Sequence, residues 1–223
     1  MHKESRYLVS SILEIALLRN KMAFISGPRQ VGKTTLAKLL KKHFDLMHYE
    51  NFDDNKFKKT WITNPQKSIE SFPLEKIHQK NLLILDEIHK SKFWKQKIKG
   101  LYDVYNEQIC FVVTGSARLN VYKKGGDSLL GRYFHFRLNP LSLAELCLSI
   151  TDGPDHLIKN LMNTPNENNH QAILEDLMSF GGFPEVYFAK NKKILNLWRK
   201  GRLEKIIRED LRDLTRIHET IQV

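Results

Sequence analysis

The chain has 223 residues, which is enough for one large domain or for one domain with a small appendage. Hydrophobic residues make up 41% of it, an ordinary share for a globular protein, and no run approaches the ~18 consecutive apolar residues of a membrane-spanning helix. The formal net charge of +11 fits an acidic partner such as DNA as well as it fits a surface of scattered lysines. The two cysteines, Cys110 and Cys147, and the histidines show no metal-type spacing, which argues against structural zinc and favours reduced thiols, with Cys110 buried.

The first apolar stretch, 7–18, follows Lys3 and Arg6 and therefore has the outline of a signal peptide. However, Glu14 interrupts it, and no small-residue cleavage site follows. The pattern predicts an amphipathic helix near 5–19 that packs on the next domain, in a cytoplasmic protein without a membrane segment.

A buried strand is predicted at 22–26 and a helix at 33–43, and a complete G-x-x-x-x-G-K-[ST] phosphate-binding loop lies between them. Its two glycines let successive backbone N–H groups point at phosphate oxygens, at a helix N-terminus that favours anions. Lys33 adds a charge that reaches the β- and γ-phosphates, and the Thr34 hydroxyl ligates Mg²⁺. The alternative is a glycine turn without a ligand. The residues expected to contact the nucleotide are Gly27, Pro28, Arg29, Gln30, Val31, Gly32, Lys33, Thr34 and Thr35.

A strand at 46–50 and a mixed lysine-rich region at 55–78 precede a third strand, 81–86, whose apolar run ends in Asp86 and Glu87. Ligands bind at the carboxyl ends of the strands in open α/β sheets. We therefore expect Asp86 to hold Mg²⁺ and Glu87 to deprotonate the water that attacks the γ-phosphate. Glu87 could instead be a solvated turn residue.

The helix predicted at 92–106 mixes lysines with aromatic residues, as some nucleic-acid-binding segments do. Helical spacing places its apolar residues on one stripe and its lysines on another. We expect the apolar stripe to pack on the sheet, and contact of the lysines with a phosphate backbone is the alternative. The stripe consists of Trp94, Ile98, Leu101 and Tyr105.

A fourth strand, 109–114, is followed by hydroxyl residues at the same predicted edge. Thr114 or Ser116 could hydrogen-bond the attacking water or the γ-phosphate, and Ser116 could equally cap a helix. A fifth strand, 133–138, stops before Pro140. The alternation of strands and helices up to this point predicts an α/β domain with a parallel sheet.

Beyond Pro140 only helices are predicted. They lie at 142–148, 171–180 and 191–219, with a polar link at 151–170 and a break at Gly181-Gly182-Phe183-Pro184. We therefore expect a nucleotide-binding domain at 1–150 and a helical region at 151–223.

Three motifs, at 27–35, 85–87 and 114–117, together resemble those of the AAA+ superfamily. More narrowly, the chain resembles prokaryotic ATPases in which an AAA domain precedes a C-terminal domain of unassigned function. Further agreements are Trp94, Gly131-Arg132-Tyr133, Pro140-Leu141-Ser142 with Glu145, Gly181-Gly182-Phe183-Pro184 and Arg208-Glu209-Asp210-Leu211. Relatives generally continue into a second domain, so the resemblance implies a shortened member or a truncated reading frame.

The resemblance implies a three-layer α/β/α P-loop NTPase fold with parallel strand order 5-1-4-3-2 and a small helical region. It also implies ATP and Mg²⁺ as ligands. Thr114 or Ser116 would be the sensor of the γ-phosphate, with Ser116 the favoured one of the two. Arg132 would engage the γ-phosphate from its own or a neighbouring subunit of a homo-oligomer, or would only form a surface salt bridge. Gly182 and Pro184 would touch the nucleotide, although an ordinary helix break explains them as well.

The sequence therefore favours a cytoplasmic ATPase that hydrolyses ATP to ADP and phosphate and moves a protein or DNA target. The alternative is a nucleotide-gated DNA- or protein-binding module with little or no turnover. A P-loop kinase is less favoured, because the sequence offers no recognisable acceptor pocket.

Overall fold

The computed structural model describes residues 6–70, 72, 81–115, 129–147 and 167–205. The chain divides into two compact units, Met1–Pro165 and Asn166–Val223, and each is described by itself. The boundary predicted at 150/151 lies outside the described residues.

The first unit is built on a parallel sheet of five strands in the order β2-β3-β4-β1-β5. Read from the other edge, this is 5-1-4-3-2, so the predicted α/β fold and its strand order are confirmed. The strands are β1 (Met22–Ser26), β2 (Leu46–Asn51), β3 (Asn81–Asp86), β4 (Ile109–Thr114) and β5 (Tyr133–Arg137). Every residue of β1 and β3 is buried, as expected for central strands covered on both faces.

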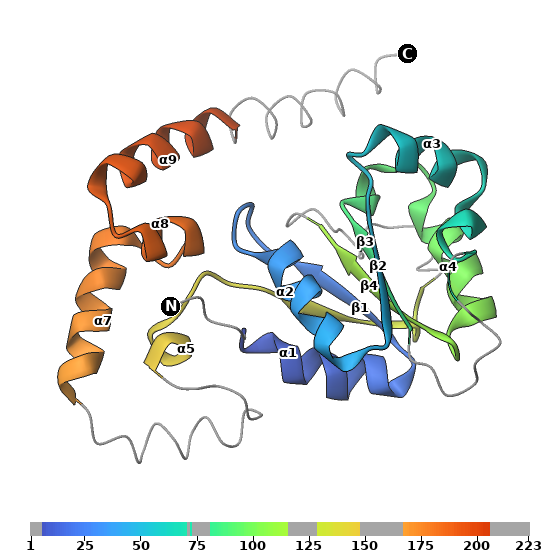
Figure 1. The fold of residues 1–223 in the computed structure, drawn as a ribbon, viewed down its shortest axis with the longest axis horizontal. Helices are drawn as coiled ribbons and strands as arrows, with labels where there is room; N and C mark the ends of the chain where they lie inside the picture. The colour runs from blue at the N-terminus through green and yellow to red at the C-terminus, as the bar shows by residue number, and fades with distance from the viewer. Residues whose placement is uncertain (1–5, 71, 73–80, 116–128, 148–166, 206–223) are drawn as a thin grey trace. The chain divides into compact units, whose positions relative to one another are not determined.

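Helices cover both faces of this sheet (Figure 1), which gives the three-layer arrangement. The α-helices of the first unit are α1 (Leu8–Ser11), α2 (Lys33–Leu39), α3 (Asn55–Thr63), α4 (Trp94–Tyr105) and α5 (Leu143–Cys147). Shorter 3₁₀ segments lie at Leu40–His43, Pro65–Ser68 and Ile88–Lys90. The lysine-rich region thus contains α3, and the Asp54 side chain caps it by accepting from the N–H groups of Lys56 and Phe57 at 2.7 and 2.9 Å.

A hydrophobic cluster fills the space between the sheet and α3 and α4. Phe24, Leu83 and Phe111 supply it from alternate positions of three strands, and Trp61 of α3 is fully buried in it. Ile98 and Leu101 are buried, and Trp94 and Tyr105 pack against the cluster. The predicted apolar stripe of the helix at 92–106 is therefore confirmed.

The N-terminal helix differs from the regular helix predicted at 5–19. After α1 the chain continues as a π-helix, Ile12–Ala16, and a 3₁₀ turn, Leu17–Arg19, which ends at Asn20 with φ +53°. Ile12, Ala16 and Leu17 are all buried. The wider π turn places these three side chains on the face of the helix that packs on β1 and β5.

The second unit consists of α7 (Glu167–Phe180), α8 (Pro184–Ala189) and α9 (Lys192–Lys205). Gly181, with φ +76°, ends α7, and its N–H donates to Leu177 O at 2.8 Å. The last predicted helix, 191–219, is described only as far as α9 extends. No helix in the described parts of the chain is both long enough and apolar enough to cross a membrane.

Candidate nucleotide-binding site

Three strands end side by side at one edge of the sheet, the edge that is formed by the carboxyl ends of the strands. Strand β4 lies between β1 and β3, and Thr114 aligns with Ile25 on one side and with Asp86 on the other. The phosphate-binding loop follows β1, so the loop, Asp86 and Thr114 are brought together. This is the edge at which the sequence predicts the ligand.

The loop itself has an unusual backbone. Gly27, Gln30 and Gly32 have φ values of +155°, +64° and +96°. A Cβ atom on Gly27 would lie 2.3 Å from Leu138 O, so the loop packs directly on the backbone after β5. Helix α2 begins at Lys33 with Gly32 as its N-cap, and a helix that starts at a glycine offers the N–H groups of its first turn to an anion.

The Lys33 side chain is folded into the loop. Its Nζ donates to Gly27 O at 3.1 Å and to Pro28 O at 2.9 Å, and only 8% of its surface is exposed. The positive charge is thus held within the turn of backbone that surrounds it. This is the place where a phosphate group would need it.

Three hydroxyl groups surround the Asp86 carboxylate. Thr34 Oγ1 and Tyr49 OH donate to Oδ2 at 2.8 and 2.6 Å, and Thr114 Oγ1 donates to Oδ1. Only 4% of Asp86 is exposed. Thr34, Asp86 and Thr114 can be recognised from the sequence motifs, but Tyr49 cannot, because a tyrosine in an edge strand is an ordinary β-strand residue.

The phenol of Tyr49 remains protonated at neutral pH. Partial burial, followed by its hydrogen bond to Asp86 and the nearby negative charge, raises the pKa of Tyr49 well above its ordinary value. Tyr49 is therefore a hydrogen-bond donor to this carboxylate under physiological conditions.

Glu87 begins the turn after β3 with a left-handed backbone, φ +57° and ψ +21°, and its N–H donates to Thr114 O at 3.0 Å. Its Oε2 lies 3.5 Å from Lys90 Nζ and 3.7 Å from His89 Nε2. Burial alone would lower the pKa of Lys90, but the hydrogen bond to Asp53 and the charge of Glu87 outweigh it and raise that pKa. Burial lowers the pKa of His89, so at neutral pH the cation facing Glu87 is Lys90.

The donor atoms at this edge suit a hard divalent cation. Thr34 Oγ1 and the Asp86 carboxylate supply neighbouring oxygen atoms, the ligand type that Mg²⁺ prefers. Among the described residues, no group of three or more His, Cys, Asp or Glu side chains is placed to hold a metal. A phosphate-bound Mg²⁺ does not need such a group, since water and phosphate oxygens complete its coordination.

The two hydroxyl residues after β4 differ in what can be said of them. Thr114 is fully buried and is bonded to Asp86. Ser116, the favoured sensor in the sequence analysis, lies outside the described residues.

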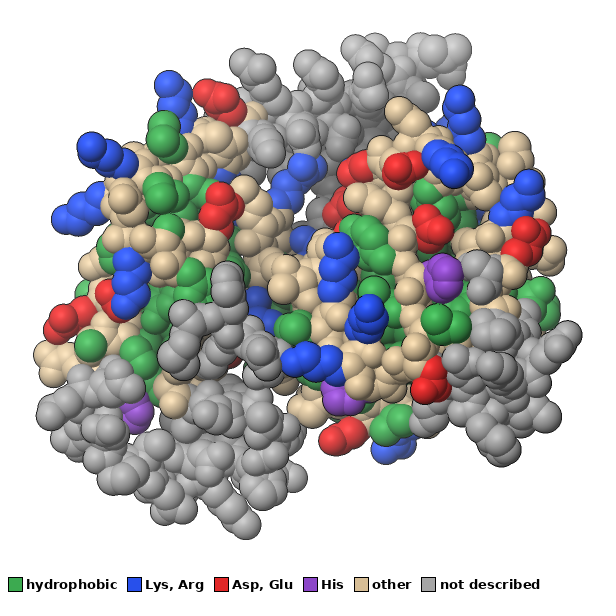
Figure 2. Space-filling view, in the orientation of Figure 1, with side chains coloured by type: hydrophobic (Ala, Val, Ile, Leu, Met, Phe, Trp, Pro, Cys, Tyr) green, Lys and Arg blue, Asp and Glu red, His purple; other side chains and the backbone are tan. Residues whose placement is uncertain are grey.

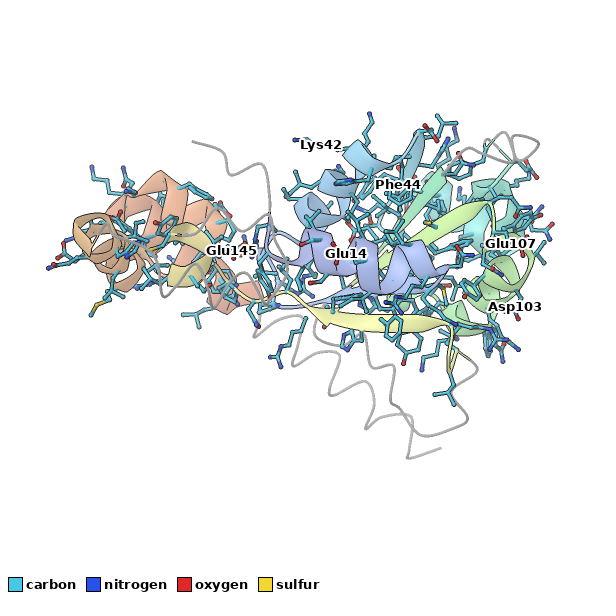
Figure 3. All side chains as sticks on the ribbon, turned by 90° about the horizontal axis from the view of Figure 1, so that it is seen from below. Glu14, Lys42, Phe44, Asp103, Glu107 and Glu145 are labelled. Carbon is cyan, nitrogen blue, oxygen red and sulfur yellow. The ribbon has the colours of Figure 1, made fainter. Side chains whose placement is uncertain are left out.

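Arg132 lies at the opposite edge of the sheet, the edge that is formed by the amino ends of the strands. Its carbonyl accepts from Met22 N–H at the start of β1, and its guanidinium pairs with Asp103, with Nε 2.6 Å from Oδ1. In Figure 3, Asp103 lies far from Glu145, which marks the end of the sheet near the loop. A five-residue strand of roughly 16 Å separates Arg132 from its own loop, more than an arginine side chain spans. In this structure Arg132 therefore does not reach its own loop, and its contact with a γ-phosphate, in its own or in a neighbouring subunit, stays a prediction.

Gly182 and Pro184 lie in the second unit, in the turn between α7 and α8. Pro184 is the first residue of α8, and the Phe183 ring packs on Trp198 with the ring centroids 4.9 Å apart. The Arg202 guanidinium lies over the Phe183 ring, with its Cζ 4.1 Å from the ring centroid. Within this unit the segment joins two helices, and its contact with a nucleotide stays a prediction.

A buried ion pair between Arg6, near the N-terminus, and Glu145 supports the loop. The sequence motifs did not predict this pair. Arg6 Nε donates to Glu145 Oε1 at 2.6 Å, while Nη1 and Nη2 donate to Val31 O and Asn139 O, both at 2.9 Å. Arg6 is 7% exposed and Glu145 is 2% exposed. The only signal in the sequence was the placement of Glu145 shortly after the Pro-Leu-Ser motif.

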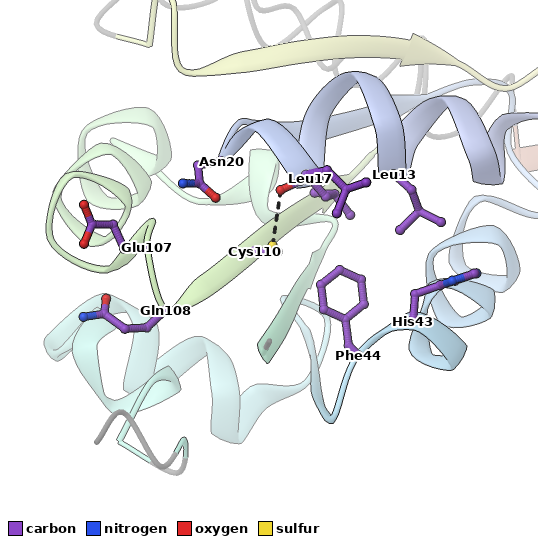
Figure 4. A pocket seen from close by; sticks show the side chains of 9 residues that line it. Leu13, Leu17, Asn20, His43, Phe44, Glu107, Gln108 and Cys110 are labelled. Carbon is purple, nitrogen blue, oxygen red and sulfur yellow. Dashed lines mark hydrogen bonds between the residues drawn. The ribbon is translucent and has the colours of Figure 1, made fainter. Parts of the chain in front are cut away.

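A cavity of about 270 Å³ lies at the opposite edge of the sheet from the loop (Figure 4). Leu13, Leu17 and Phe44 line it together with Cys110, whose Sγ donates to Leu17 O at 3.6 Å. Cys110 is half-buried rather than buried, because it borders this cavity. The cavity contains none of the residues predicted to bind nucleotide.

The surface charge in the orientation of Figure 2 is mixed. Lys and Arg side chains are spread over this face and are interspersed with acidic ones. This distribution agrees with the scattered-lysine interpretation of the net charge for the face shown.

A family model described as an AAA domain matches residues 19–147. The chain belongs to this family. The match covers all five strands and the phosphate-binding loop, so the first unit contains an AAA domain of the P-loop, AAA+ type.

Two curated relatives carry no functional name. The chain is 27% identical over 206 residues to uncharacterized protein MJ1544 of Methanocaldococcus jannaschii, covering 92% of this chain and 45% of that protein. It is 23% identical over 202 residues to uncharacterized protein Rv2008c of Mycobacterium tuberculosis, covering 91% of this chain and 38% of that protein. The chain thus spans less than half the length of these relatives.

Among solved structures, the chain is similar to AMPPCP-bound DnaA from Aquifex aeolicus. The TM-score is 0.42 at 15% identity, covering 91% of this chain and 67% of that one.

Proposed function

We propose that this AAA domain binds ATP with Mg²⁺ and hydrolyses it to ADP and phosphate in the cytoplasm. The observation that carries the proposal is the junction of Thr34 Oγ1 and the Asp86 carboxylate, 2.8 Å apart, directly after the loop that encloses the Lys33 ammonium. This arrangement combines a cation site with a phosphate site. Membership in the AAA family supports the same function.

Each step assigned to the chain uses a residue at this edge. The N–H groups of the loop and Lys33 bind and orient the phosphates, and Thr34 and Asp86 would hold the cation. The bound Mg²⁺ would supply neutralisation of phosphate charge. Glu87 takes the proton of the attacking water, with Thr114 O holding its backbone in place.

The hydrolysis is proposed to drive a conformational change that acts on a DNA or protein target, in a homo-oligomer in which Arg132 of one copy serves the next. The net charge of +11 is compatible with a DNA target, and the partly exposed position of the Arg132–Asp103 pair leaves Arg132 accessible to a neighbouring copy. Ser116 as sensor, and Gly182 and Pro184 as further nucleotide contacts, belong to the same proposal.

A second candidate is a nucleotide-gated DNA- or protein-binding module with little turnover. The observation that favours it is the approach of Lys90 Nζ to Glu87 Oε2 at 3.5 Å. A carboxylate that is neutralised by a cation accepts a proton from water less readily.

The test is the change Glu87→Gln, measured by nucleotide binding and by phosphate release. We expect ATP binding to persist and phosphate release to fall by about 10²–10⁴-fold, the usual contribution of a general base. Glu107→Gln is the matched control, because Glu107 is exposed at the opposite edge and should leave both measurements unchanged.

Turnover that survives Glu87→Gln would remove Glu87 from this role. A wild-type chain that binds Mg·ATP but releases no phosphate would favour the module. A wild-type chain that binds no nucleotide at millimolar concentration would contradict both functions.

A further inference from the structure

Tyr49 connects the edge strand β2 with the predicted cation site. Its backbone pairs with Ile84 of β3, two positions before Asn51 pairs with Asp86. The half-buried side chain extends along the strand, and its hydroxyl donates to Asp86 Oδ2 at 2.6 Å. Lys38 of α2 covers the ring, with Nζ 4.2 Å from the ring centroid, so the ring is held from the helix side as well.

The donors to Asp86 come from three different elements. Thr34 belongs to α2, Tyr49 to β2 and Thr114 to β4. A carboxylate can rotate about its last bond, and donors to both oxygens fix that rotation. If Mg²⁺ binds, the Thr34 oxygen becomes a metal ligand, so the Thr34 contact must readjust. Of the donors to Asp86 that the structure describes, the hydroxyls of Tyr49 and Thr114 are then the two that do not take part in coordination.

We propose that Tyr49 is a positioning residue that sets the Mg²⁺ affinity of the nucleotide complex by holding the Asp86 carboxylate in its binding orientation. The proposal rests on the function proposed above and extends it to a residue that no sequence motif includes. Hydrogen-bond partners of a metal-binding carboxylate commonly change metal affinity by about 10–100-fold when they are removed.

The experiment compares the wild-type chain with Tyr49→Phe. This change keeps the ring, and with it the contact with Lys38, and removes only the hydroxyl. The first readout is the affinity of a fluorescent ATP analogue as Mg²⁺ is added, which gives the Mg²⁺ concentration at which half of the increase in affinity is reached. The second readout is the binding of Mn²⁺, followed by electron paramagnetic resonance in the presence of a non-hydrolysable ATP analogue. We expect about 10-fold more metal to be needed, with analogue affinity in EDTA unchanged.

Tyr102→Phe is the matched control. Tyr102 also donates its hydroxyl to a single oxygen, Asn20 O at 2.5 Å, but it lies on α4 away from the loop. It should leave the metal titration unchanged. This comparison separates loss of the Asp86 contact from the general effect of losing a tyrosine hydroxyl.

A double-mutant cycle with Asp86→Asn adds a readout that a general structural effect would not move. Once the carboxylate is gone, Tyr49→Phe should cause no further loss of metal affinity, so the two changes should be strongly non-additive. Fully additive effects, or an unchanged metal titration in Tyr49→Phe, would overturn the inference and leave the proposed function intact. Absence of nucleotide binding by the wild-type chain would overturn the proposed function and the inference together.

Discussion

At the residue scale, two glycines of the first unit occupy backbone sites with opposite requirements. Gly27 opens the phosphate-binding loop at φ +155°, where an added Cβ would lie 2.3 Å from the backbone oxygen of Leu138. Gly100 lies inside α4, and a Cβ there would meet no atom within 4 Å. A methyl group is therefore unfavourable at the first position and favourable at the second.

We expect Gly27→Ala to destabilise the fold by about 1–3 kcal/mol, because the loop and the segment after β5 must separate. Gly100→Ala, the matched control, should stabilise it by about 0.5–1 kcal/mol, because alanine loses less backbone freedom in a helix. Urea unfolding curves at fixed slope would measure both. A Gly27→Ala chain as stable as the wild type would contradict the close packing of the loop on Leu138.

At the scale of elements, the ion pair of Arg6 and Glu145 joins segments that are far apart in the sequence. The guanidinium bonds the carboxylate of α5, the loop at Val31 and the segment after β5 at Asn139. Both charged groups are buried, so neither can be rehydrated when its partner is removed.

We therefore expect Glu145→Gln to destabilise the protein by about 3–5 kcal/mol, because it leaves the buried Arg6 charge without its partner. Asp103→Asn is the control, since it breaks an exposed pair with Arg132 and should change the unfolding midpoint little. The double variant Arg6→Met/Glu145→Leu should recover much of the loss, because apolar side chains need no partner. Equal effects of Glu145→Gln and Asp103→Asn in denaturant titrations would show that burial does not matter at this pair.

The sequence predicts the strands of this sheet well and the contacts between distant segments poorly. Buried runs such as 81–86 and 109–114 can be recognised locally, because both faces of these strands are covered and the residues at 82–85 and 109–113 are apolar. The parallel register then places Asp86 beside Thr114 without further information. Tyr49 and Arg6 depend on which segments meet in space, and no local pattern encodes that.

The position of Arg132 shows a related limit. The motif Gly131-Arg132-Tyr133 suggests a role at the phosphates, but the motif cannot say at which end of β5 the arginine lies relative to the loop. Because β5 is parallel to β1 and begins beside Met22, Arg132 lies at the amino end, away from its own loop. The direction of the strand, and not the chemistry of the residue, sets the distance between Arg132 and its own loop.

At the scale of the whole molecule, the predicted contact of Gly182 and Pro184 with the nucleotide has a measurable consequence for the second unit. A ligand that binds only the folded state protects from hydrogen exchange the backbone that it orders. A nucleotide held by the loop alone would protect α2 and the ends of β1 and β3. A nucleotide that also contacts Gly182 or Pro184 would protect α8 as well.

We expect Mg·ATP to slow amide hydrogen exchange both in the loop, 27–35, and in the second unit over 181–190. Exchange should be followed by mass spectrometry on the whole chain, with Mg²⁺ alone and with a Lys33→Ala variant as controls, because Lys33 supplies the charge within the loop. Protection in the loop with none over 181–190 would reduce Gly182 and Pro184 to a junction between helices. Protection that persists in Lys33→Ala would mean that the nucleotide binds elsewhere.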